Sequence, residues 1–180
     1  MIRAGIVGAT GYAGLELVRL LLRHPEATVA AVSSVSFEGK PLAEVYPSLA
    51  EITPLVCGTA DEVVAASDVV FAALPHGLSQ ALARQCADAG KRFIDLGADF
   101  RLDDPAVYTQ WYGCDVEYPD LHAEAVYGLP ELFRDAIRGA RVVGNPGCYP
   151  TAAALGLAPL LRAGLCGTQR GNVIRHKFSL

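Results

Sequence analysis

Apolar runs of strand length alternate along this chain with longer segments in which apolar residues recur at helical spacing. The runs are rich in β-branched residues and end at or before glycine, proline or serine, which is typical of strands buried on both faces of a sheet. We predict strands over residues 2–7, 28–32, 68–75, 91–97 and 141–143.

Segments of helical periodicity follow most of these runs. The predicted helices cover residues 15–23, 79–89, 132–138 and 150–161. Residues 36–62 are interrupted by glycine and proline, so we expect loop, a short helix and at most one short strand there. Residues 105–120 lack clear periodicity and are expected to form a packed connection. The alternation predicts an α/β fold with a right-handed, doubly wound, mostly parallel sheet of the Rossmann type.

Composition narrows the class of protein. The chain has 180 residues, of which 52% are hydrophobic and 19% charged, with a formal net charge of -4. This length fits one globular domain, and the weak negative charge argues against a role on nucleic acid. The first residues lead directly into a strand, and no apolar run is long enough for a membrane span. We therefore expect a cytoplasmic protein that does not enter a membrane.

Cysteine and histidine are present without the spacing of a metal site. The cysteines are Cys57, Cys86, Cys114, Cys148 and Cys166. Their number is odd and none forms a Cys-x-x-Cys pair, so neither disulfides nor a structural zinc are expected. The four histidines show no His-x-x-x-His spacing, and we predict no metal.

A glycine-rich turn joins the first predicted strand to the first helix. It has the spacing G-x-x-G-x-x-G, and glycines let a backbone approach a pyrophosphate that the helix N-terminus attracts. The alternative is a plain strand-to-helix turn, against which the position at the N-terminus weighs. The residues predicted to bind a dinucleotide here are Gly8, Thr10, Gly11, Tyr12, Ala13 and Gly14.

Two serines follow the second predicted strand, where NAD-preferring sites carry an acidic residue about 20 residues after the glycines. A hydroxyl accepts a ribose 2′-phosphate that a carboxylate would repel. Ser33 and Ser34 therefore favour NADP as the coenzyme, although both could simply begin a loop.

Loops after parallel strands lie at the carboxyl edge of the sheet, where open α/β sheets bind ligands. Pro75, His76 and Gly77 are therefore expected to border the coenzyme. His76 is a candidate acid or base, but a packing or capping role is the commoner one for a loop histidine. Arg101 follows the next strand and suits a phosphate or carboxylate. A salt bridge to Asp99, Asp103 or Asp104 is equally compatible with the sequence.

The last predicted strand ends in the turn Gly144-Asn145-Pro146-Gly147, and Cys148 lies between this turn and the next helix. Unpaired N–H groups and the positive end of the helix dipole favour a thiolate there. We predict that Cys148 is a nucleophile beside anion-binding amides. The alternative is a small apolar residue that closes a tight turn.

Five motifs together closely resemble those of the N-acetyl-gamma-glutamyl-phosphate reductases of arginine biosynthesis. They lie at residues 8–14, 73–77, 97–102, 127–131 and 145–151, and the resemblance covers roughly residues 1–165. It implies NADPH-dependent reduction of a small acyl phosphate to an aldehyde through a thioester on Cys148, with Arg101 and Asn145 at the substrate. It also implies a homo-oligomer for the full-length relatives. Aspartate-semialdehyde dehydrogenases are more distantly similar and remain an alternative.

Members of this family continue into a second, α+β domain that binds substrate and forms the dimer. We expect residues 1–147 to bind the dinucleotide, residues 148–164 to begin the second domain, and residues 165–180 to be a divergent tail. His176 in that tail does not match the family's catalytic histidine. The resemblance thus implies a largely missing second domain and impaired turnover, and a non-catalytic NADP-binding module is the competing hypothesis.

Overall fold

A single parallel sheet organises the chain, seen in a computed structural model that describes residues 1–165. Its seven strands run in the order β3-β2-β1-β4-β5-β7-β6, and every adjacent pair is parallel. The strands are β1 (Ile2–Val7), β2 (Ala27–Ser33), β3 (Cys57–Gly58), β4 (Val69–Ala72), β5 (Arg92–Asp95), β6 (Val126–Tyr127) and β7 (Val142–Gly144). The predicted doubly wound α/β sheet is confirmed.

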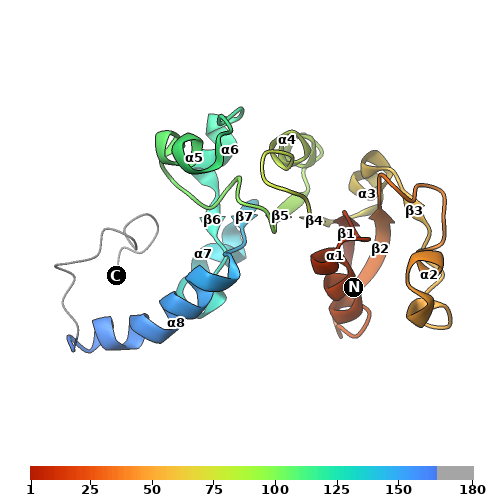
Figure 1. Cartoon of the computed structure of the whole chain (residues 1–180), viewed down its shortest axis with the longest axis horizontal. Coiled ribbons are helices and arrows are strands. Elements are labelled where there is room, and N and C mark those ends of the chain that lie inside the picture. Colours follow the sequence, from red (N-terminus) through yellow and green to blue (C-terminus); the bar gives the residue numbers. More distant parts are fainter. Residues whose placement is uncertain (166–180) are drawn as a thin grey trace.

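Helices cover both faces of this sheet (Figure 1). They are α1 (Tyr12–Leu21), α2 (Leu42–Val45), the 3-10 helix η1 (Pro47–Leu49), α3 (Ala60–Ala66), α4 (Gln80–Asp88), α5 (Pro105–Tyr112), α6 (Pro119–Glu124), α7 (Pro130–Gly139) and α8 (Cys148–Arg162). Alternation along β1 separates two cores. Ile6 packs with α1 and α2 on one face, whereas Val7 packs with α3 and α4 on the other.

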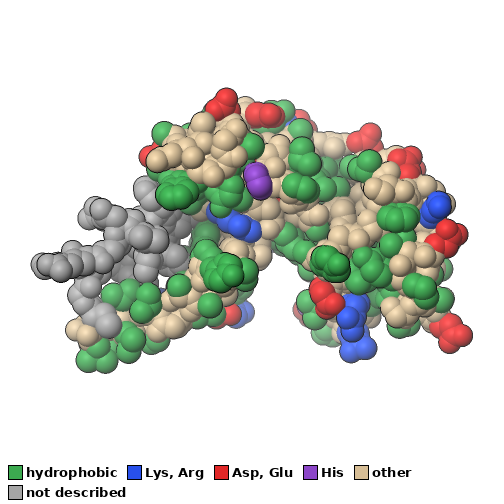
Figure 2. Space-filling model, in the orientation of Figure 1, with side chains coloured by type: hydrophobic (Ala, Val, Ile, Leu, Met, Phe, Trp, Pro, Cys, Tyr) green, Lys and Arg blue, Asp and Glu red, His purple; other side chains and the backbone are tan. Residues whose placement is uncertain are grey.

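The α1 face is covered at its two ends rather than in the middle. Figure 2 shows the surface hollowed between α1 and α8, and Phe71 of β4 and Ile94 of β5 are only partly buried. A smaller core of Tyr127, Leu129 and Ala154 joins α8 to β6 beyond this hollow.

Three helices lie where the sequence indicated loop or connection. Thr59 and Glu62 form a reciprocal capping box that starts α3. The Thr-x-x-Glu spacing of this capping box is present in the sequence. Asp104 caps α5, and Gly113 ends it in the left-handed conformation. Helix α6 begins at Pro119, which suits a first helical position. The tail at 166–180, including His176 and Cys166, lies outside the described residues.

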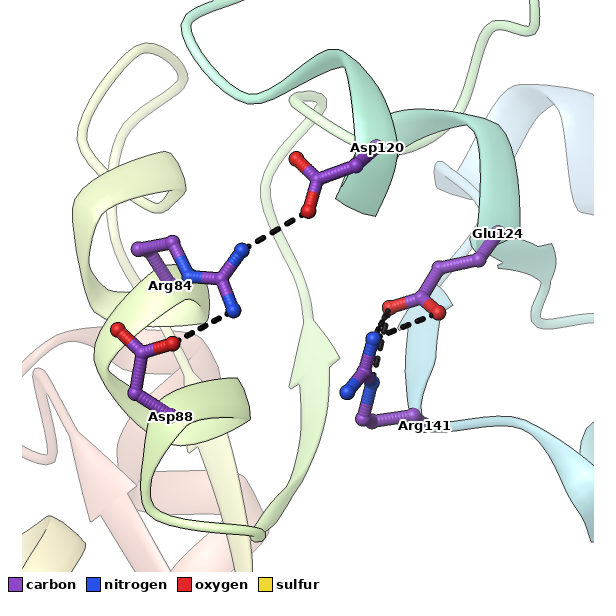
Figure 3. A network of polar contacts seen from close by, with 5 residues as sticks. All are labelled: Arg84, Asp88, Asp120, Glu124 and Arg141. Carbon is purple, nitrogen blue, oxygen red and sulfur yellow. Dashed lines mark hydrogen bonds and ion pairs between the residues drawn. The ribbon is translucent and has the colours of Figure 1, made fainter.

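Ion pairs fasten α6 to its neighbours (Figure 3). The Arg84 guanidinium of α4 contacts Asp88 at 2.6 Å and Asp120 of α6 at 2.9 Å. Arg141, just before β7, donates to both carboxylate oxygens of Glu124 at 2.7 and 2.8 Å. Paired geometry of this kind fixes direction as well as distance. The pair with Arg141 therefore orients α6 relative to the segment before β7, although partly exposed pairs of this kind add little stability.

Candidate active site

The glycine turn after β1 is shaped by contacts that exclude side chains. Gly8 has φ +85°, and a Cβ there would overlap the carbonyl oxygen of Ala73 in the loop after β4. A Cβ on Gly14 would overlap the Gly8 carbonyl. Strand order reverses between β1 and β4, and ligands of open α/β sheets bind at such a point. The turn thus lies where a dinucleotide site is expected.

Helix α1 begins directly at this turn. Gly11 is its N-cap without a side-chain cap bond, and the Gly11 N–H donates to the Gly8 carbonyl at 3.2 Å. Tyr12 and Ala13 form the exposed first turn, where helical N–H groups lack intrahelical acceptors. These free N–H groups and the dipole give an anion-binding surface.

The turn is tied to the end of β2. The Thr10 and Ser34 hydroxyls are 2.7 Å apart, and the Ser33 carbonyl accepts two N–H bonds from the turn. Ser33 and Ser34 are both buried. Tyr46, which sequence reasoning missed, donates from its hydroxyl to the Thr10 carbonyl at 2.7 Å. The two predicted serines therefore do lie beside the glycine turn.

The loop after β4 stands next to this turn. Pro75 and His76 are exposed, and Gly77 adopts φ +84°. The His76 ring lies 5.5 Å from the Tyr112 ring of α5, measured between centroids. That contact corresponds to the packing role that the sequence left open for His76.

Cys148 is the exposed first residue of α8, with Gly147 as its N-cap. The helix thus begins two residues earlier than the predicted start at Pro150. The Gly147 carbonyl accepts from the Thr151 hydroxyl at 2.9 Å and from the Thr151 N–H at 3.0 Å. The thiol therefore lies at the N–H end of a helix whose first turn is held by two hydrogen bonds.

Arg101 lies against the Cys148 turn. Its Nε donates to the Asn145 carbonyl at 2.7 Å and its Nη2 to the Leu96 carbonyl at 2.8 Å. A Cβ on Gly147 would come within 3.3 Å of Nη1. Because β5 and β7 are neighbours, the structure brings the predicted residues Arg101, Asn145 and Cys148 to one corner.

Two of the carboxylates considered as partners of Arg101 serve other groups. Asp104 accepts the Ala106 N–H at 2.9 Å as the cap of α5. Asp99 is wholly buried and accepts from the loop after β4 and from Tyr108.

A second buried carboxylate, Asp95, was not predicted. It accepts the Gly97 N–H at 2.9 Å and the Asp99 N–H at 3.1 Å. Burial is the main cause that raises its pKa to about 6. Its position at the end of β5, followed by glycine, was the available sequence signal.

This pKa predicts an unusual pH dependence of stability. Because the folded state holds the Asp95 proton more tightly, the group adds stability below its unfolded pKa near 4. The contribution is lost as pH rises through about 6. Urea unfolding of wild type and Asp95→Asn should show wild type losing on the order of 2 kcal/mol relative to the variant across that range. A constant difference between the two proteins would contradict the raised pKa.

The other described thiols are unsuited to nucleophilic attack. Cys57 and Cys86 are buried, and burial raises the pKa of Cys57 and brings that of Cys86 to about 12. Cys114 is half-buried, with Sγ 3.5 Å from the Tyr112 carbonyl oxygen. Among residues 1–165, Cys148 is thus the exposed cysteine.

The described residues offer neither a metal site nor a membrane-spanning helix. Residues 1–165 contain no group of histidine, cysteine and acidic side chains that could hold a metal ion. No helix among them has the length and apolar character needed to cross a membrane.

Comparison with known proteins identifies the family of this chain. Residues 3–140 match the family model for the semialdehyde dehydrogenase NAD-binding domain. N-acetyl-gamma-glutamyl-phosphate reductase of Symbiobacterium thermophilum is 60% identical over 169 residues, covering 93% of this chain and 49% of that protein. The same enzyme of Clostridium beijerinckii is 52% identical over 165 residues, covering 92% and 48%. The chain therefore spans about half the length of these curated relatives.

A solved structure shares the fold at low identity. Aspartate semialdehyde dehydrogenase with NADP from Candida albicans superposes with a TM-score of 0.63 at 16% identity, covering 90% of this chain and 47% of that one. The predicted resemblance to N-acetyl-gamma-glutamyl-phosphate reductases is confirmed, and the chain belongs to the semialdehyde dehydrogenase family through its NAD-binding domain.

Proposed function

We propose that this chain supplies the NADP-binding half and the cysteine nucleophile of an enzyme that reduces N-acetyl-gamma-glutamyl phosphate to N-acetylglutamate semialdehyde in arginine biosynthesis. One observation carries the proposal. The glycine turn, the loop after β4 and the Arg101–Cys148 corner all follow strands of one parallel sheet. The name of the two reductases compared above supplies the substrate.

The residues present fit a dinucleotide. At Gly8 and Gly14 the close backbone leaves no room for a Cβ, and the N–H groups that open α1 suit the pyrophosphate. Ser33 and Ser34 would hold the 2′-phosphate, while the loop 75–77 would border the nicotinamide. Bound NADPH supplies a hydride.

Cys148 would attack the acyl phosphate carbonyl as a thiolate. The new C–S bond forms as the C–O bond to phosphate breaks, which leaves a thioester and inorganic phosphate. Arg101 would bind the departing phosphate. The N–H groups at the start of α8 would stabilise the oxyanion that forms at the attacked carbonyl. Cys148 would then serve as the leaving group: collapse of the tetrahedral alkoxide formed from the reduced thioester would break the C–S bond, expel the Cys148 thiolate and release the aldehyde. Asn145 would orient the substrate beside Arg101.

We further propose that the coenzyme domain extends to residue 147 and that α8 begins the second domain of the longer relatives. Helix α8 buries Ala154 and Ala158 but exposes Leu155, Leu157 and Leu160. An apolar surface of this kind is typical of an interface between domains.

Turnover tests the proposal in the reverse direction, with the semialdehyde, phosphate and NADP as reactants. NADPH formation from N-acetylglutamate semialdehyde would support the proposed enzyme. NADP binding without turnover would favour the non-catalytic module, because this chain spans only about half the length of its relatives. Preference for aspartate semialdehyde would instead favour an aspartate-semialdehyde dehydrogenase-like enzyme.

Coenzyme choice gives a separate prediction. Ser34→Ala removes a hydroxyl proposed to bind the 2′-phosphate, so the dissociation constant for NADPH should rise roughly tenfold. The dissociation constant for NADH should rise less. NADH has no 2′-phosphate, so the substitution affects it only through the lost contact between Ser34 and Thr10. Fluorescence titration measures both. Equal weakening of the two coenzymes, or equal affinity in wild type, would refute the role assigned to the serines.

A further inference from the structure

Asp99 connects three segments through one buried carboxylate. Its Oδ1 accepts from the Gly77 N–H at 2.6 Å and from the Tyr108 hydroxyl at 2.9 Å. Its Oδ2 accepts the Ser79 N–H at 3.0 Å. The side chain has no exposed surface. A buried acid with three donors is a strong and directional anchor.

Most of the segment that Asp99 holds lies at the surface, between β4 and α4. Pro75, His76 and Leu78 are exposed, and Gly77 needs a left-handed backbone, with a Cβ there meeting the Cys114 sulfur. The N–H bonds to Asp99 and the His76 contact with α5 tie loop 75–79 to other parts of the fold. The loop also makes local backbone bonds: the Leu78 N–H donates to the Pro75 carbonyl at 3.4 Å, and the Ser79 carbonyl accepts the Ala83 N–H of α4 at 2.9 Å.

Asp95 extends the same network toward the nucleophile. Its carboxylate accepts the Asp99 N–H, and its backbone carbonyl accepts the Asn145 N–H at 2.8 Å. Asn145 in turn accepts from Arg101 beside Cys148. One chain of hydrogen bonds thus runs from loop 75–79 to the cysteine corner.

We infer that Asp99 is a positioning residue for the coenzyme, which holds loop 75–79 where the nicotinamide end of NADP binds and keeps it in register with the Cys148 turn. This inference rests on the proposed function. It assigns Asp99 no contact with the coenzyme itself. Its effect should therefore be confined to the nicotinamide end and be absent at the adenine end, which the glycine turn holds.

Two probes separate these ends. NADPH carries both, whereas 2′,5′-ADP carries only the adenine part that would contact the glycine turn and the serines. Asp99→Asn keeps the side-chain volume but replaces one carboxylate oxygen with an NH2 group. That NH2 group cannot accept a hydrogen bond from a loop N–H. We expect its NADPH dissociation constant to rise about tenfold while that of 2′,5′-ADP stays within about twofold.

Tyr108→Phe is the matched control, because it removes the donor on α5 and leaves both loop bonds. Its NADPH affinity should stay within about twofold of wild type, even though loss of a buried hydrogen bond lowers its Tm. Equal weakening of both probes by Asp99→Asn, or no weakening of either, would overturn the inference alone. Failure of the unsubstituted chain to bind NADPH would overturn the proposed function and this inference with it.

Discussion

Replacing Cys148 with serine should lower turnover at least about a thousandfold, because a serine hydroxyl is almost wholly protonated near neutral pH and is a far weaker nucleophile than a thiolate. The same variant should fail to form the thioester. That step needs no coenzyme, so it can be followed by mass spectrometry after mixing the chain with N-acetyl-gamma-glutamyl phosphate alone. Acylation thus reports on the nucleophile even if the chain completes no full cycle.

Cys114→Ser is the control for this experiment. Cys114 is the other cysteine of residues 1–165 that is not fully buried, and its sulfur lies against Gly77 rather than at a helix start. Its removal should leave acylation unchanged. Acylation that persists in Cys148→Ser would exclude the proposed mechanism, and acylation lost only in Cys114→Ser would move the nucleophile to that residue.

The sheet was largely predictable because its strands are short and apolar on both faces. Strand β1 matches its predicted bounds, and the other predicted strands agree within a few residues at each end. Strand β6 has two residues, too few for any periodicity. Helices α5 and α6 were missed because the aromatic residues at 108–118 obscure the helical pattern. Their boundaries are set by caps and prolines instead.

The candidate site was only partly predictable. The glycine turn and Cys148 carry local signals, namely glycine spacing and a strand-to-helix corner. The approach of Arg101 to Asn145 depends on β5 and β7 being neighbours, which no local pattern specifies. Asp99 was considered only as a partner of Arg101. Its real donors lie about 20 residues earlier and nine later, so tertiary folding alone brings them together.

Gly14→Ala should abolish measurable NADPH binding and lower the free energy of unfolding by about 1–3 kcal/mol. A Cβ at this position would overlap the Gly8 carbonyl and lie 2.8 Å from the Ala9 Cα. Both are backbone atoms, so relief requires α1 to move away from the turn. That movement would take the N–H groups of the helix start away from the proposed pyrophosphate position. NADPH fluorescence and urea unfolding measure the two effects.

Gly11→Ala separates binding from folding. Its Cβ would meet nothing closer than 3.5 Å and its φ of -77° is ordinary for alanine. Alanine is a weaker N-cap than glycine but loses less chain entropy on folding, so stability should stay within about 1 kcal/mol of wild type. The added methyl would nevertheless stand at the helix start that is proposed to face the phosphates, and NADPH binding should weaken at least about tenfold. Gly156→Ala lies within α8, where the new Cβ meets no atom within 4 Å. It should leave NADPH binding unchanged and raise the free energy of unfolding by up to about 1 kcal/mol. Wild-type affinity in both Gly11→Ala and Gly14→Ala would mean that the coenzyme does not lie on this turn.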